Sequence, residues 1–107
     1  MEKVKAVFYL PKLDNNGRSL KTEIKELEME LTLRFAGWTC QGYVTGHYRM
    51  ADGSSAKDVN ASYFVIMEKA RIDELKELLH GFIKKMQQEA IYLEIQKEVE
   101  FYLVLRD

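Results

Sequence analysis

The amino-acid sequence predicts an α+β fold built as one domain over residues 1–107. Two segments have apolar residues every three or four positions, as amphipathic helices do, and five others alternate or stay apolar over a few residues, as strands do. A chain of 107 residues, 47% of them hydrophobic, can bury one core, and we find no linker or repeat that would divide it.

The first half of the chain is predicted to begin with a strand at Val4–Leu10, because this β-branched and aromatic run ends at the only proline, Pro11. After a polar turn, residues 20–35 are predicted to form a helix, because their apolar side chains recur on one helical face. These side chains are Leu20, Ile24, Leu27, Leu31 and Phe35.

Residues 38–50 alternate with a period of two and predict a second strand. A polar turn at Asp52-Gly53 leads to residues 61–67, which are apolar on both faces, so a central strand is expected there. A second helix is then predicted from Ile72, Leu75, Leu79, Phe82 and Met86. The segments "AIYLEI" (90–95) and "EVEFYLVL" (98–105) are expected to close the fold as a hairpin that turns at Gln96-Lys97.

This order predicts a ferredoxin-like βαββαβ sandwich with an extra C-terminal strand, in which a single antiparallel sheet has both helices on one face. The first and third strands occupy the middle of such a sheet. If Trp38, Cys40, Val44 and Tyr48 pack under the helices, the alternate residues of the second strand point to the uncovered face. These residues are Gln41, Tyr43, Thr45, His47 and Arg49.

The uncovered face is expected to be aromatic, and large exposed apolar patches usually mark contact sites. We therefore expect a homodimer, the commonest closed oligomer, that binds a protein or a small molecule through this face. The five residues Gln41, Tyr43, Thr45, His47 and Arg49 are the predicted ligand or interface residues.

Two other functions are consistent with the same residues. An enzyme of the α+β-barrel type could use His47 as a general base in a cleft between two subunits. An RNA-binding sheet could stack bases on Tyr43 with Tyr63 or Phe64, although the basic-glycine opening of the RNA-recognition motif is absent. No cofactor motif or metal-ligand spacing occurs, and Cys40 is expected to be structural, so neither a cofactor nor a metal is predicted.

Composition limits the partners further. The chain has 16 basic and 17 acidic residues, interspersed to a net charge of −1, which disfavours a nucleic-acid or membrane-surface binder. No apolar run approaches the roughly 20 residues that span a bilayer, and the N-terminal run is too short for a signal peptide. With one cysteine and no internal disulfide, a cytoplasmic location is expected.

Several short motifs resemble those of a group of small uncharacterised ferredoxin-like proteins of bacteria, phages and plasmids. The pattern comprises Phe35-Ala36-Gly37-Trp38-Thr39, Gly46-His47-Tyr48, Asp52-Gly53, Asp58 and Gln88-Glu89-Ala90-Ile91-Tyr92. Ala36 replaces a glycine of that pattern, and Tyr48 replaces a tryptophan. The resemblance implies the ferredoxin-like fold and no particular activity.

Overall fold

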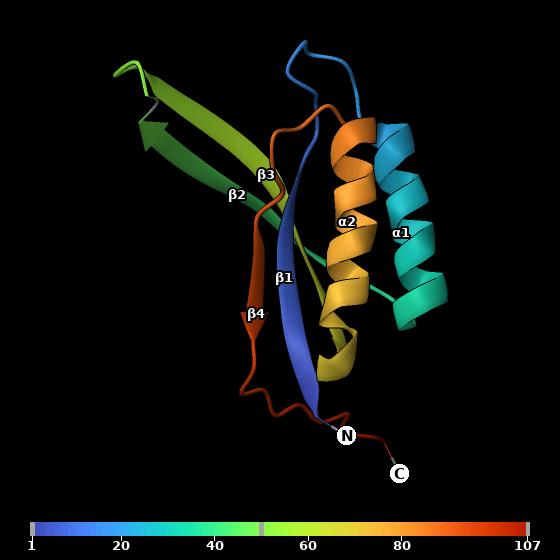
Figure 1. Ribbon diagram of the computed structural model, residues 1–107. Coiled ribbons are helices and arrows are strands. Elements are labelled where there is room, and N and C mark those ends of the chain that lie inside the picture. Colours follow the sequence, from blue (N-terminus) through green and yellow to red (C-terminus); the bar gives the residue numbers. More distant parts are fainter. Residues whose placement is uncertain (1, 50, 107) are drawn as a thin grey trace.

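The computed structural model describes residues 2–49 and 51–106, in which four strands and two helices follow one another as β1(Lys3–Pro11), α1(Lys21–Phe35), β2(Thr39–Arg49), β3(Ser55–Glu68), α2(Ile72–Lys85) and β4(Leu93–Gln96). A single 3₁₀ turn, Lys69–Arg71, leads into α2. The strands form one antiparallel sheet in the order β2-β3-β1-β4, with both helices on the same face (Figure 1). The predicted α+β, ferredoxin-like class is confirmed, and β1 and β3 are central.

The core lies between the sheet and the two helices. Every second residue of β1 is fully buried and pairs with a buried residue of β3, as Phe8 does with Tyr63 and Val4 with Met67. The helices contribute the apolar side chains that the 3.6-residue period predicted, because that period places them on the face turned to the sheet. The buried helix residues are Leu27, Leu31, Phe35, Leu75, Leu78, Leu79 and Phe82.

The β2-β3 hairpin extends well beyond the rest of the sheet. Pairing between β1 and β3 ends at Pro11 and Asn60, whereas β3 continues to pair with β2 as far as Ser55 and Arg49. Residues 45–49 and 55–59 therefore form a two-stranded arm that projects past the body, and the molecule is 54 Å long against 28 and 26 Å in the other directions (Figure 1).

The predicted closing hairpin forms only in part. Its first strand is β4, but residues 97–106 form irregular chain that pairs with no strand among the described residues. Two-residue hairpin turns need positive φ, which Asn, Asp and Gly adopt readily, and Gln96-Lys97 supplies none of these residues. The extra C-terminal strand is thus absent from the sheet, and the segment leaves β4 to cross below β1 (Figure 1).

Candidate functional site

A β-bulge divides β2 into two parts that face differently. Cys40 pairs with Tyr63 and Tyr43 pairs with Ala61, so Gln41 and Gly42 together lie opposite one residue of β3. Gly42 has φ of +99°, a value that favours glycine, and this permits the extra residue. Because side chains alternate along a strand, the extra residue reverses the facing of everything that follows it.

The bulge corrects the expectation that the five predicted residues share the uncovered face. Gln41, which precedes the reversal, does lie on that face, where its Nε2 donates a hydrogen bond to the buried Ser62 Oγ at 3.1 Å. The four others follow it and lie on the helix side of the sheet, as their pairing with β3 requires. These are Tyr43, Thr45, His47 and Arg49. Conversely, Val44 and Tyr48 lie on the helix-free face and not under the helices.

Of the four reversed residues, Thr45, His47 and Arg49 lie on the arm and Tyr43 lies just before it, and all four are exposed. Tyr43 is 59% exposed, and the Lys12 ammonium lies 4.3 Å from the centre of its ring. His47 pairs with Lys57 in the ladder, is exposed, and has no hydrogen-bond partner within residues 2–49 and 51–106.

Residues at the start of β2 also differ from expectation. Cys40 lies on the helix side, as predicted, but its thiol is exposed and free. Trp38 is 39% exposed and packs at 5.5 Å on the ring of Tyr63. Tyr63 itself is buried, and its hydroxyl donates to Glu28 Oε2 at 2.6 Å. Burial, reinforced by this carboxylate, raises the pKa of Tyr63. Because Tyr63 is only 5% exposed, its ring cannot stack an RNA base.

A groove of about 920 Å³ lies between the arm and the body. One wall is the arm, the other is the β1-α1 loop with the connection from α2 to β4. An aromatic cluster lines it, in which Tyr9 and Tyr92 stack at 4.6 Å and Tyr48 approaches from the arm. Polar side chains complete the lining, chiefly Asp58, Asn60, Gln88 and Glu89.

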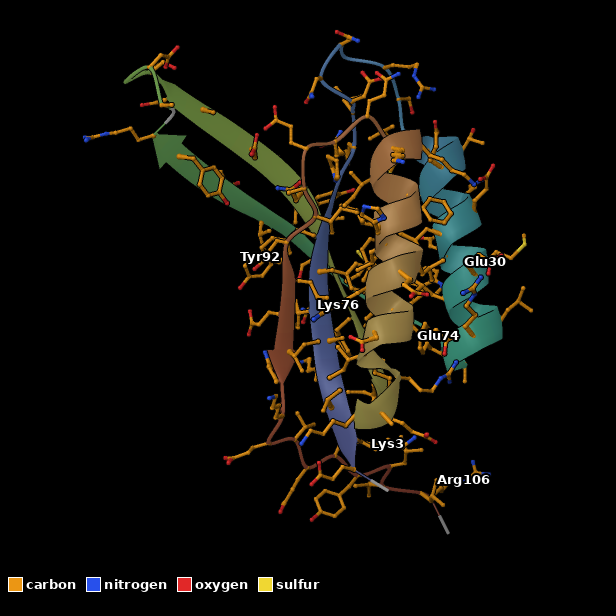
Figure 2. The ribbon with its side chains drawn as sticks, viewed as in Figure 1. Lys3, Glu30, Glu74, Lys76, Tyr92 and Arg106 are labelled. Carbon is orange, nitrogen blue, oxygen red and sulfur yellow. The ribbon has the colours of Figure 1, made fainter. Side chains whose placement is uncertain are left out.

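The groove opens mainly on the helix-free side. Tyr9, Asn60, Asp58 and Tyr48 all lie on that face by their ladder partners. Tyr92, just before β4, also projects away from the helices (Figure 2). Its hydroxyl donates to Glu94 Oε1 at 2.9 Å, and this bond raises the pKa of Tyr92, so the phenol stays neutral. The groove thus offers flat aromatic rings beside hydrogen-bond donors and acceptors.

Gly46 positions one of these rings. A Cβ at residue 46 would lie 2.6 Å from Cζ of Tyr48, because the phenol ring of Tyr48 folds back over the Gly46 backbone. A larger residue there would push the ring away. The two glycines of β2 therefore act differently: Gly42 reverses the strand, and Gly46 makes room for an aromatic side chain of the groove.

The buried carboxylate of Asp14 holds the β1-α1 wall in shape. Its Oδ1 accepts the backbone N–H groups of Asn16 and Arg18, both at 2.9 Å, and its Oδ2 accepts Nε of Arg18 at 3.1 Å. These interactions, the Arg18 backbone bond above all, hold the pKa of Asp14 below its usual 3.8 despite burial. Asn15 Nδ2 then donates to the Gln87 carbonyl at 3.3 Å and joins the two parts of this wall.

The pKa of Asp14 leads to a prediction about acid stability. A carboxyl with a depressed folded-state pKa stabilises the fold above its unfolded pKa, and this contribution disappears as pH falls through the folded pKa. The variant Asp14→Asn is expected to be less stable than the parent at pH 7 and to lose less stability between pH 5 and pH 2. Urea unfolding followed by circular dichroism at each pH measures both. If the free energy of unfolding fell equally with pH in the two proteins, the lowered pKa of Asp14 would be contradicted.

Sequence reasoning placed the candidate residues on the second strand and did not identify the groove. Of the predicted residues, none lines the groove, while Tyr48, Asp58 and Gln88 do. A signal was available: three separate motifs of the stated resemblance, at 46–48, at 58 and at 88–92, each contribute a lining residue. Residues far apart in the sequence meet there because the α2-β4 connection lies beside the arm.

Two chemical features bear on cofactors and membranes. Within the described residues, no three His, Cys, Asp or Glu side chains are grouped so as to hold a metal ion. Neither helix of the described chain has the length and apolar character needed to cross a bilayer. Any binding in the groove would therefore depend on the side chains that line it.

Comparison by sequence finds no family model and no curated protein that matches the chain. Comparison by structure finds several likenesses. A DUF3240-family protein from Shewanella baltica OS155 has a TM-score of 0.65 at 14% identity, over 98% of this chain and 99% of that one. CutA from Synechococcus elongatus PCC7942 has a TM-score of 0.61 at 9% identity, over 92% and 78%.

A third likeness is to a phage SAM lyase in complex with S-methyl-5'-thioadenosine, with a TM-score of 0.63 at 13% identity over 90% of this chain and 81% of that one. Identities this low establish a common fold and leave activity open. The chain accordingly shares the small ferredoxin-like α+β fold of these CutA-like proteins.

Proposed function

We propose that the protein is a small cytoplasmic binding protein that works as a homodimer, with two copies packed through the helix-free sheet face. The observation that supports this proposal is the apolar centre of that face. Phe64 and Ile66 lie half-buried there beside Tyr9, and no element of the described chain covers them. Monomers seldom leave such a patch in water, because covering it gains about 25 cal/mol per Å² of apolar surface.

The groove supplies a place for a ligand next to this face. Its mouth lies on the helix-free side, so a second copy packed there would narrow the groove and screen the ligand from water. Stacked tyrosines suit a flat ring, and the amide and carboxylate groups suit its polar substituents. The neighbouring phage SAM lyase is described with a methylthio-nucleoside, a ligand of this general kind. A cytoplasmic location also suits the exposed thiol of Cys40, which would stay reduced there.

Light scattering on a sizing column tests the dimer. We expect a mass twice the 12.5 kDa of one chain at concentrations of about 50 μM. The variant Phe64→Glu should weaken the dimer at least ten-fold, about 1.4 kcal/mol, because it buries a carboxylate between the sheets. Lys5, whose ammonium lies 4.3 Å from the Phe64 ring centre, can pair with this carboxylate in the monomer and so preserve the fold.

A matched control is Leu33→Glu, which changes an apolar residue of α1 that is 74% exposed and lies away from the sheet. It should leave the dimer intact. Thermal unfolding of both variants verifies that they fold. A parent protein that stays monomeric at this concentration, or a Phe64→Glu variant as dimeric as Leu33→Glu, would refute the proposed interface.

A further inference from the structure

The segment 98–105 has the properties of a strand that lacks its partner. Its side chains alternate between Val99, Phe101, Leu103 and Leu105 on one side and mostly polar residues on the other. Leu103 is 83% exposed and Leu105 74%, and no backbone hydrogen bond joins the segment to the sheet within the described residues. Exposed apolar strands of this kind are rare unless another strand pairs with them.

The sheet has a free edge that suits such a strand. The strand order places β2 (Thr39–Arg49) at one edge of the sheet, where its outer side pairs with no strand among the described residues. The segment 98–105 starts from β4, at the opposite edge, about three strand spacings or 14 Å away. Eight extended residues span only about 26 Å, so the segment cannot cross its own sheet and still pair along its own β2. A second copy can offer the same edge directly.

The charged and the apolar side chains of segment 98–105 both favour one register against β2. Aligning the segment antiparallel to β2 with Glu98 opposite Arg49 places Glu100 opposite His47. Opposite charges on directly facing residues stabilise a strand pair, and Glu100 gains a hydrogen-bond donor in the His47 ring.

The same register sorts the apolar side chains. It places Val99 beside Tyr48 and Leu103 beside Val44, both of which the bulge turns to the helix-free face. Phe101 then lies beside Gly46, next to the ring of Tyr48 that folds over the Gly46 backbone. Val99, Phe101, Leu103 and Leu105 therefore join the face that we propose is buried in the dimer, and the two acids lie on the other side together with Tyr102 and Val104.

From these matches we propose that segment 98–105 of one copy adds as an antiparallel strand to the β2 edge of a second copy, and that the exchange is reciprocal. The inference rests on the proposed homodimer. It further requires a two-fold axis that lies between the two packed faces and runs obliquely to the strands, since such an axis brings the β2 edge of one copy across the end of the other from which segment 98–105 departs. Strand addition of this kind derives affinity from main-chain bonds and selectivity from alternate side chains.

Disulfide trapping between two differently tagged chains tests the register. Both chains carry Cys40→Ser, one also carries Tyr43→Cys, and the other carries Val104→Cys. The two new thiols face each other in the proposed pair, and both positions are exposed, 59% and 94%, so the fold should tolerate them. Copper-phenanthroline oxidation of the mixture should join the two tags. Replacing the first thiol by one at Met29 of α1, which is 66% exposed, is the control and should give no cross-link.

A full-length variant separates this inference from the dimer itself. Replacing Val99, Phe101 and Leu103 by serine should raise the dissociation constant of the dimer at least ten-fold, whereas Met29→Ser with Leu33→Ser should not change it. A monomeric parent protein would refute the proposed function. A dimeric parent with an unaffected triple-serine variant, and no cross-link between positions 43 and 104, would refute only the strand exchange.

Discussion

The substitution Phe8→Ala is expected to lower the free energy of unfolding by about 3–5 kcal/mol, the range for removing a large aromatic side chain from a packed core. Phe8 is fully buried at the middle of β1 and stacks on Tyr63 at 5.8 Å with the two rings nearly parallel. Its neighbours belong to β3, β4 and the helices, so no single element can move to fill the cavity. Urea unfolding followed by circular dichroism measures the loss.

The control for Phe8→Ala is Leu33→Ala, which also truncates a large apolar side chain but at a position 74% exposed on α1. This change should stay within about 0.5 kcal/mol of the parent, as surface substitutions usually do. Equal losses for the two variants would mean that the core is not centred on β1.

The second large effect concerns the bulge, and a pair of identical substitutions isolates it. Gly42→Ala should lower the free energy of unfolding by about 1–2 kcal/mol, because an alanine Cβ resists the left-handed region and φ is +99° at this residue. Gly81→Ala, inside α2, should raise it by about 0.5–1 kcal/mol, because alanine favours helix over glycine. Neither new Cβ would meet another atom within 4 Å, so crowding contributes to neither result.

Chemical unfolding of the two alanine variants gives the free energies, and opposite signs are the expected outcome. A stable Gly42→Ala protein would contradict the bulge described here. Nuclear magnetic resonance checks the register directly. The bulge places Tyr43 opposite Ala61, so contacts between these two residues are expected, and a β2 strand without the bulge would not show them.

Most of the fold follows from the sequence because its elements have strong periodic patterns. The apolar residues of residues 20–35 and 72–86 repeat with the helical period, and both segments are helices in the structure. Residues 61–67 are apolar on both faces, and β3 is indeed central. These predictions succeed because burial, which dominates folding energetics, selects residue type at each of those positions.

The facing of β2 could not be predicted from alternation alone. A bulge inserts one residue without altering the period on either side of it, so the polar and apolar residues of 38–50 still alternate. The sequence does contain a glycine at the site of reversal, but Gly46 is equally a candidate, and only one of the two has positive φ. The five predicted residues were consequently divided between the two faces.

The sequence also could not predict that segment 98–105 lies unpaired within its own chain. Its alternation is that of a genuine strand, and whether a strand pairs within its own chain depends on the preceding turn and on which edge lies within reach. Similarly, the groove arises from the angle between the arm and the body. That angle depends on sheet twist, which no local pattern encodes.

The arm has one further physical consequence. Beyond the pair of Pro11 and Asn60 it is a ribbon of two strands, and isolated two-stranded hairpins are only marginally stable in water. Its opening therefore costs less free energy than unfolding the four-stranded body, and amide hydrogens of residues 45–49 and 55–59 can exchange with solvent while the core remains closed. The arm can therefore unfold separately from the four-stranded body. Because the arm forms one wall of the groove, a partner that holds the arm in place also sets the width of the groove.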